Sequence, residues 1–188
     1  QRGSCKSRID FQNVGQKISY SNRGQKDFLP QNLRIGLSYK INLDKNNSLE
    51  FVCDANKLLV PSPPVYDTSG NIIAGMNPNR TVGNALYTSF YDAPGGYREE
   101  LREINIASGI EYWYNKTLAI RTGYFYEHAT KGGRKYLTFG IGGRYAGIGL
   151  DLSYLLPTEQ RHPLQNTIRF TFLYEFGKHN KSAHKKSS

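Results

Sequence analysis

The segment 166–177 alternates strictly between apolar and polar residues. Apolar or aromatic side chains occupy every second position, namely Ile168, Phe170, Phe172, Tyr174 and Phe176. A period of two residues is typical of a β-strand with one apolar face and one polar face. The apolar face needs a covering, either the second layer of a soluble sheet or the hydrocarbon of a bilayer. This requirement constrains the fold more than any other feature of the sequence.

The same period recurs along most of the chain. It is clear in six further segments, at 32–43, 48–56, 104–114, 117–128, 136–145 and 148–156, and weaker at 10–21. Composition agrees, because 14 Tyr, 9 Phe and 19 Gly beside a single Met favour strands over helices. We therefore predict about eight strands.

The connections between these strands alternate in length. Tight turns are expected at 44–47, 115–116 and 146–147, whereas 21–31, 58–103, 129–134 and 159–165 are longer. Outer-membrane barrels sort their connections in this way, with short periplasmic turns and long extracellular loops. The interpretation places the long loops outside the cell and the C-terminus in the periplasm.

The polar face of the strands carries charges of both signs. Such side chains can pair across a lumen, whereas a charge facing lipid costs roughly 2–4 kcal/mol at mid-membrane. The predicted lumen charge network comprises Arg34, Lys40, Glu50, Asp54, Glu111, Arg121, Glu127, Arg144, Asp151, Arg169 and Glu175. We predict an all-β, antiparallel transmembrane β-barrel in contact with membrane lipid and lipopolysaccharide. A soluble β-sandwich is the alternative.

The positive charge of the chain does not indicate a nucleic-acid partner. The net charge is +10, but basic residues without acids are concentrated in the first nine residues and in 178–188. A phosphate-tracking groove would require basic residues clustered on the folded part. The segment 178–188 is expected to be a basic periplasmic tail.

The connection 58–103 is too long for a simple turn. Loops beyond about 15 residues are usually functional or disordered. Its last part is expected to be a turn followed by a short helix, with Glu99 and Glu100 near the helix start. Exposed aromatic side chains are unfavourable in water, so we predict a partner-binding surface that includes Tyr87, Phe90, Tyr91 and Tyr97. A plain linking loop is the alternative.

No pattern in the sequence indicates catalysis. The four histidines have no metal-ligand spacing, and no G-x-S-x-G motif is present. The glycines of "FGIGGR" lack the following helix that a phosphate loop requires. We expect no enzyme activity, no metal and no cofactor.

Several phrases together resemble a known family. They are "NVGQKISYS", "FLPQNLRIGLSYK", "DANKLLVPSPPV", "SFYDAPGGYREELREI" and "DLSYLLPT…NTIRFTFLYEFGK". They are similar to the PorV family of the type IX secretion system, part of the wider group of FadL-like barrels. The resemblance implies that residues 11–177 are the C-terminal part of a barrel of roughly fourteen strands. Residues 1–10 do not fit the strand expected before "DFQNVG".

The resemblance also implies a non-enzymatic role in protein export. Family members bind the C-terminal signal domains of secreted cargo at a SprA-type translocon barrel. They then deliver the cargo to a PorU-type sortase at the cell surface. The loop residues that carry over are Asp92, Ala93, Pro94, Gly95, Gly96, Glu99 and Glu100. A FadL-like channel for small hydrophobic molecules is the alternative.

Overall fold

One antiparallel sheet dominates the structure. The computed structural model describes residues 3–19, 26–158 and 167–176. Its eight-stranded sheet has the order β1-β2-β3-β6-β7-β8-β9-β10. These strands are β1 (Gly3–Gln12), β2 (Asn32–Asn42), β3 (Ser48–Leu58), β6 (Ile104–Tyr114), β7 (Leu118–Tyr126), β8 (Lys135–Tyr145), β9 (Ile148–Pro157) and β10 (Thr167–Tyr174). The prediction of about eight antiparallel strands is confirmed. Within the described residues β1 and β10 do not pair, so the sheet is open.

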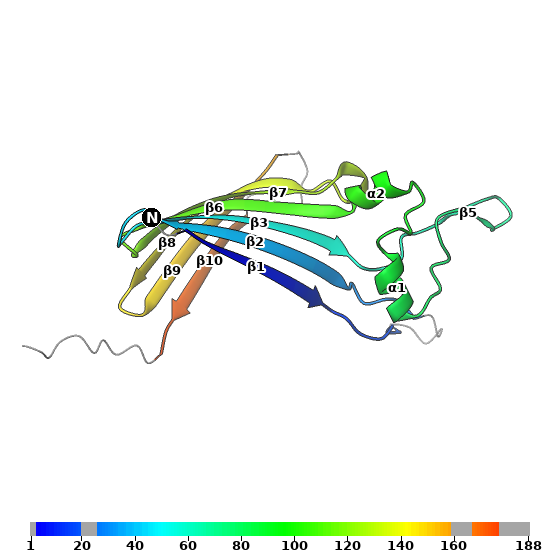
Figure 1. Ribbon diagram of the computed structural model, residues 1–188, viewed down its shortest axis with the longest axis horizontal. Helices are drawn as coiled ribbons and strands as arrows, with labels where there is room; N and C mark the ends of the chain where they lie inside the picture. Colours follow the sequence, from blue (N-terminus) through cyan, green and yellow to red (C-terminus); the bar gives the residue numbers. More distant parts are fainter. Residues whose placement is uncertain (1–2, 20–25, 159–166, 177–188) are drawn as a thin grey trace, which may run out of the picture.

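The short and long connections lie at opposite ends of the sheet (Figure 1). Asn115 and Lys116 have φ values of 50° and 54°, and Ala146 and Gly147 have 47° and 81°. Positive φ at both central residues matches the twist of the flanking strands and defines a tight hairpin turn. The turn after β2 closes where the Leu43 N–H donates to the Asn47 carbonyl at 3.0 Å. These three turns form the short-turn end, and the helices lie at the long-loop end.

The long connection after β3 contains more structure than the sequence analysis expected. It holds a two-stranded hairpin of β4 (Val65–Tyr66) and β5 (Ile72–Ala74), followed by helix α1 (Val82–Thr88). Helix α2 (Tyr97–Arg102) is the short helix predicted from the sequence, with Glu99 and Glu100 in its first turn. A short 3₁₀ helix, Ala129–Lys131, lies between β7 and β8.

The first strand begins earlier than predicted. Strand β1 spans Gly3–Gln12 and pairs with β2 from Gly3↔Ile41 to Gln12↔Asn32. Residues 3–10, whose sequence did not fit the strand expected before "DFQNVG", thus form most of β1. Serine, lysine and cysteine give this stretch a weak alternation, so pairing with β2 decides its conformation. In the described remainder of the predicted strand, residues 13–19, the one β-bridge is the isolated pair Ile18↔Asp27. The predicted tail, 178–188, lies outside the described residues.

The apolar side chains of the sheet point outward and are uncovered. Among the described residues, the buried hydrophobic side chains are Leu59, Ala85, Ala93 and Ala119. By contrast, Leu150 is 62% exposed, Phe170 79% and Phe172 65%. A soluble domain of this size buries such side chains in a core. The outer face of the sheet is therefore a surface that requires an apolar environment.

Neighbouring residues on β10 offer a direct comparison of the two faces. Phe170→Arg places a charge on the outer face, whereas Thr171→Arg places the same charge on the inner face. We expect Phe170→Arg to destabilise the protein in a bilayer by about 2–4 kcal/mol, because a lipid-facing charge loses its hydration. Unfolding from lipid vesicles in urea measures the difference. Equal effects of the two variants would contradict a hydrocarbon-facing outer surface.

Candidate functional site

The connection 59–103 folds back onto the long-loop end of the sheet. Leu59 is 1% exposed, and its N–H donates to the Gln31 carbonyl at 2.7 Å. Lys57 occupies a position in the outward apolar series of β3, yet it is only 6% exposed. The end of β3 is thus covered by the loop, and the charge of Lys57 requires a partner inside that contact.

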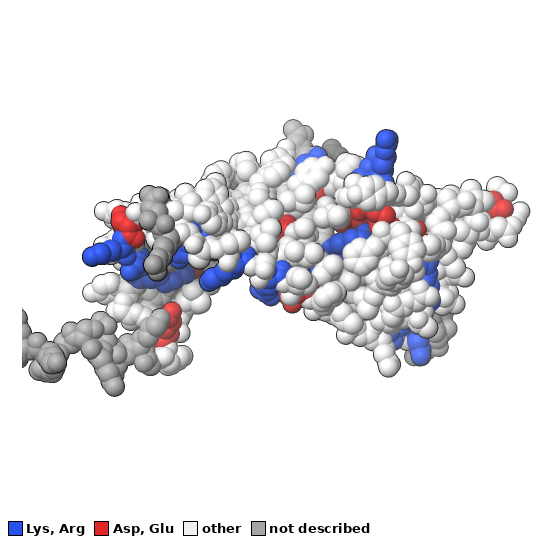
Figure 2. All heavy atoms as spheres, in the orientation of Figure 1, with Lys and Arg blue, Asp and Glu red and all other residues white. Residues whose placement is uncertain are grey.

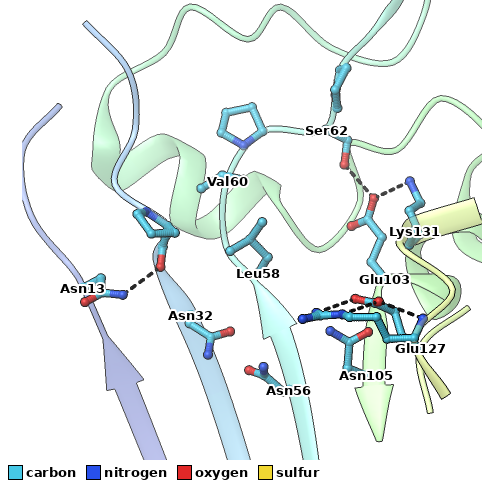
Figure 3. A pocket seen from close by; sticks show the side chains of 14 residues that line it. Asn13, Asn32, Asn56, Leu58, Val60, Ser62, Glu103, Asn105, Glu127 and Lys131 are labelled. Carbon is cyan, nitrogen blue, oxygen red and sulfur yellow. Dashed lines mark hydrogen bonds and ion pairs between the residues drawn. The ribbon is translucent and has the colours of Figure 1, made fainter. Parts of the chain in front are cut away.

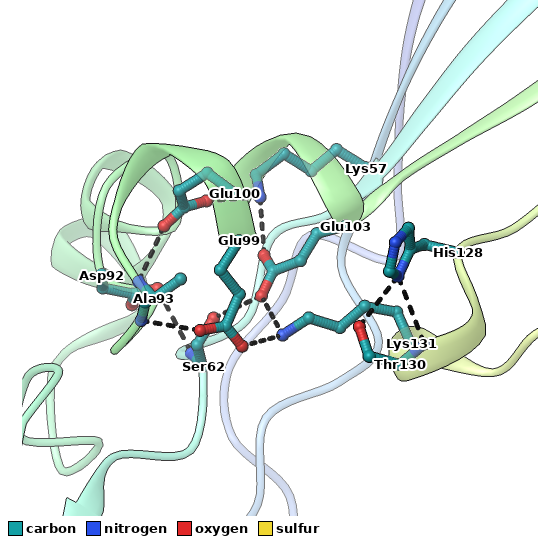
Figure 4. Close-up of polar contacts among 11 residues, drawn as sticks. Lys57, Ser62, Asp92, Ala93, Glu99, Glu100, Glu103, His128, Thr130 and Lys131 are labelled. Carbon is teal, nitrogen blue, oxygen red and sulfur yellow. Dashed lines mark hydrogen bonds and ion pairs between the residues drawn. The ribbon is translucent and has the colours of Figure 1, made fainter.

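A cluster of ion pairs supplies this partner (Figure 4). The Lys57 ammonium lies 2.8 Å from the Glu100 carboxylate and 2.7 Å from that of Glu103. The Lys131 ammonium lies 2.9 Å from the second oxygen of Glu103 and 2.6 Å from Glu99. Glu103 therefore joins β3 to the 3₁₀ helix before β8. We call Lys57, Glu99, Glu100, Glu103 and Lys131 the loop-anchoring cluster.

Two carboxylates of this cluster also shape the turn that precedes α2. The Ala93 N–H donates to Glu100 at 2.8 Å, and the Gly95 N–H donates to Glu99 at 2.7 Å. Gly96 has φ 67° and ψ −156°, a conformation that favours glycine. The sequence "DAPGG" therefore forms a turn whose orphan N–H groups are satisfied by the helix that follows it.

Asp92 is held inside the loop. It is 1% exposed, accepts a hydrogen bond from the Ser62 N–H at 3.3 Å and lies 3.5 Å from the Arg80 guanidinium. Burial raises the pKa of the Asp92 carboxyl above its ordinary value. Asp92, Ala93 and Glu100 were predicted to contact a partner, but all three are buried. Their role is to determine the conformation of the loop.

The aromatic residues of the predicted surface are accessible. Tyr87 is 73% exposed, Tyr97 76%, Phe90 48% and Tyr91 47%. The Tyr87 and Tyr91 rings pack edge to face with centroids 5.6 Å apart. We call these four residues the aromatic surface. Since the loop-anchoring cluster fixes α2 and the turn before it, the surface is held in place before any partner binds.

A cavity of about 430 Å³ lies between the loop and the inner face of the sheet (Figure 3). Its polar lining includes Asn32, Asn56, Asn105 and Glu127, and its apolar lining includes Leu58 and Val60. Glu127 forms a two-point ion pair with Arg134, at 2.7 and 2.9 Å. The hydrogen bonds from Arg134 lower the pKa of Glu127. This pair lies just beyond β7, at the rim of the sheet.

The inner face carries a second set of ion pairs, closer to the short-turn end. Arg121 pairs with Glu111 and lies 2.7 Å from Asp151, and Arg144 also lies 2.7 Å from Asp151. The centroid of the Trp113 ring lies 5.5 Å from the Arg121 guanidinium and 5.6 Å from that of Arg144. A Cβ at Gly142 would meet the ends of the Asp151 and Arg121 side chains, so a larger residue there would displace this ion pair. Four adjacent strands are thereby linked through their side chains.

The other predicted lumen charges behave differently. Arg34 pairs with Asp54 at 2.6 Å on β2 and β3. Lys40 lies opposite Glu50 in the register, but no ion pair joins them in the described part of the chain. Arg169 lies on β10, and Glu175 follows that strand, its N–H donating to the Gly147 carbonyl at 2.9 Å. The ion pairs described so far therefore join predicted residues in separate sets: Glu111, Arg121, Arg144 and Asp151 form one, Arg34 and Asp54 another, and Glu127 pairs with Arg134.

Lys57, Glu103 and Lys131 were not predicted as site residues. One signal was available, because Lys57 interrupts an apolar series that contains Leu49, Phe51, Cys53 and Ala55. A charge at such a position indicates a buried partner. Glu103 and Lys131 carry no comparable signal. Glu103 ends the segment expected to be a short helix, Lys131 lies in the connection 129–134, and neither interrupts an apolar series.

The described residues offer neither a metal-binding cluster nor a helix that could span a membrane. They contain no group of three or more His, Cys, Asp or Glu able to hold a metal ion. Within the same residues, every helix is too short or too polar to cross a membrane.

Comparison with known protein families links the chain to protein secretion. Residues 2–65 match the family model described as type IX secretion system protein PorV. Over this range the chain is PorV-like. The match confirms the resemblance to PorV predicted from the sequence and supports a role in type IX secretion. No curated protein matches the chain.

The PorV match covers the first part of the sheet. It includes β1, β2, β3 and the first residue of β4, and therefore three of the five phrases that carried the resemblance. It also begins at residue 2, which agrees with β1 as a strand of the sheet. The turn "DAPGG" and the strands from β6 onward lie beyond the match.

Removal of the Lys57 ammonium is expected to detach the loop. Lys57→Met leaves Glu100 and Glu103 buried without that cation, so we expect a loss of about 3–5 kcal/mol of stability. Arg34→Met is the matched control, because its pair with Asp54 is half-exposed and contributes below about 1 kcal/mol. Urea unfolding gives the loss of stability. Hydrogen exchange of 59–103 shows whether the loop opens first.

The same cluster predicts a pH dependence. Hydrogen bonds from Lys131 and Gly95 lower the pKa of Glu99. At Glu103, burial raises the pKa, but hydrogen bonds from Lys57, Lys131 and Ser62 outweigh this effect, and the pKa is lowered overall. The two carboxylates therefore contribute their full stabilisation of the folded loop at pH values above the pKa of glutamate in the unfolded chain, about 4.3. It is lost as the pH falls through the lower folded pKa values. Proteolysis of the loop against pH measures this loss, and Glu103→Gln should flatten the profile.

Proposed function

We propose that this protein is an outer-membrane component of the type IX secretion system that binds secreted cargo through its long-loop end. The observation that carries the proposal is the aromatic surface at that end of a sheet whose first part is PorV-like. Hydrocarbon covers the outer face of the sheet. The loop end then projects from the extracellular side of the membrane.

The aromatic surface has the chemistry of a protein-docking site. Tyrosine and phenylalanine dominate the energetics of protein interfaces because they offer large contact areas at low conformational cost. Tyr87, Phe90 and Tyr91 lie on or just after α1, and Tyr97 begins α2. The ion pairs beneath them hold the loop in one conformation, which reduces the entropy lost on binding.

In this proposal the surface binds the C-terminal signal domain of cargo as it leaves a SprA-type translocon barrel. The protein then carries the cargo to a PorU-type sortase complex at the cell surface. The chain contributes binding and positioning to this sequence of steps. Cleavage and attachment belong to the partner.

The alternative function is a FadL-like channel for small hydrophobic molecules. The cavity of about 430 Å³ favours it, because its wall includes Leu58, Val60 and Pro61. However, Glu127, Lys131 and Arg134 line the same cavity. An apolar molecule would have to pass these charges, so export is the better-supported function.

Substitution of the two most exposed tyrosines of the aromatic surface tests the proposal. We expect Tyr87→Ser with Tyr97→Ser to weaken capture of a purified cargo signal domain at least tenfold, because hot-spot aromatics contribute about 2 kcal/mol or more each. Tyr145→Ser is the matched control, since Tyr145 is 83% exposed but lies at the short-turn end. Pull-down and surface labelling of cargo in cells provide the measurements.

Two results would contradict the proposal. One is unchanged cargo capture in the double variant. The other is normal surface export accompanied by reduced uptake of fatty acids, which would favour the channel. Retention of the folded sheet is checked by urea unfolding, so that loss of binding is not confused with loss of structure.

A further inference from the structure

The short-turn end of the sheet is a rigid rim. The Asn115 N–H donates to Asn47 Oδ1 at 2.8 Å, and the Lys116 N–H donates to the Asn46 carbonyl at 2.9 Å. The turn after β2 is thereby fixed to the turn after β6. The Arg144 N–H donates to the Thr117 carbonyl at 2.8 Å, which fixes the second of these turns to β8.

A small basic cavity lies in this rim, on the opposite end of the molecule from the aromatic surface. It has a volume of about 270 Å³, and its lining includes Lys40, Lys45, Asn47, Ser48, Trp113 and Lys116. No carboxylate lines it within the described residues. Figure 2 shows lysine and arginine side chains gathered at this end, at the left of the view.

Two carboxylates near this end of the sheet, those of Asp44 and Glu111, are engaged by other groups. Asp44 accepts hydrogen bonds from the N–H groups of Asn46 and Asn47, both at 2.7 Å, and thus belongs to its own turn. Glu111 is bound by Arg121 and by the Trp113 indole N–H. Glu50 lies opposite Lys40 but does not line the cavity. In the described part of the chain, the three lysines form no ion pair.

Three ammonium groups around one cavity create a positive potential, and none of the described residues that line the cavity is a carboxylate that could neutralise it. Like charges on neighbouring turns repel one another, and this arrangement becomes favourable when an anion binds between them. A carboxylate offers two oxygens and one negative charge. A phosphate offers more oxygens and up to two negative charges, and lysine binds it as a point charge.

We propose that the cavity lined by Lys40, Lys45 and Lys116 binds a phosphate group. Asn47 and Ser48 supply uncharged hydrogen-bonding groups beside the lysines, and Trp113 forms part of the wall. The phosphate can be inorganic phosphate or the headgroup of a phospholipid. Either would bind at the end of the molecule that carries the short turns, independently of cargo binding at the other end.

Trp113 provides a reporter for this site, because it is the single tryptophan of the sequence and lines the cavity. The protein in neutral detergent is titrated with potassium phosphate, against potassium chloride at the same ionic strength. We expect a saturable change in Trp113 fluorescence with phosphate only. Phosphorus NMR line broadening of the same samples gives a second readout.

Variants of the lysines identify the site. Lys116→Gln and Lys40→Gln should each weaken phosphate binding about fivefold to tenfold, since each removes one charge-assisted hydrogen bond. Lys26→Gln is the matched control, because it changes the net charge equally in the connection between β1 and β2, at the long-loop end. Urea unfolding confirms that each variant is folded.

Further titrations distinguish inorganic phosphate from a lipid headgroup and define the results that would overturn the proposal. Competition by phosphatidylglycerol nanodiscs, but not by phosphatidylcholine nanodiscs, assigns the site to an anionic lipid headgroup. If inorganic phosphate binds equally well in the presence of either type of nanodisc, the site is assigned to free phosphate. Equal responses to acetate or chloride, or no response in either readout, would overturn the proposal. An equal effect of Lys26→Gln would do the same.

Discussion

The structure depends on continuous antiparallel hydrogen bonding between strands that keep a strict two-residue alternation. In the eight-stranded sheet, each inner strand pairs on both sides, so its backbone polar groups are satisfied within the sheet; these strands are β2, β3, β6, β7, β8 and β9. A closed set of backbone hydrogen bonds is the condition for a sheet to enter hydrocarbon. On β10 the alternation then places Ile168, Phe170 and Phe172 on one face, where all three are uncovered.

The opposite face is stabilised by charge pairs and not by an apolar core. Arg121, Asp151 and Arg144 connect β7, β8 and β9, and Glu111 extends the group to β6. Such pairs tolerate a wet interior, because water can solvate what the side chains do not satisfy. The polar face therefore fixes the relation between strands without excluding water, which a soluble sheet of this size could not do.

The functional features lie at the two ends, where the alternation stops. At the long-loop end, the loop-anchoring cluster holds α2 and the aromatic surface against β3. At the short-turn end, hydrogen bonds between turns form the rim that contains Lys40, Lys45 and Lys116. The sheet separates these two surfaces, which lie at opposite ends of the molecule.

The sequence by itself determined β2, β3 and the strands from β6 to β10. It also determined the positions of the three tight turns and the face of the sheet to which most strand side chains belong. Residues such as Ile168 and Arg169 need only the pleat of a strand to be assigned to opposite faces. It also indicated helix α2, because a turn sequence and early acidic residues mark the helix start. The exposure of Tyr87 and Tyr97 was expected because both lie in a long connection. The resemblance to PorV likewise rested on short sequence motifs, which can be recognised without the tertiary structure.

Only the tertiary structure decided the start of β1, the burial of Asp92 and Glu100, and the partners of Lys57. Strand β1 has too few apolar residues to be recognised before β2 is paired with it. Lys57 and Lys131 come together with Glu103 only when a loop of more than forty residues folds back on the sheet. Contacts between residues far apart in sequence leave no periodic pattern, and for that reason only the folded chain reveals them.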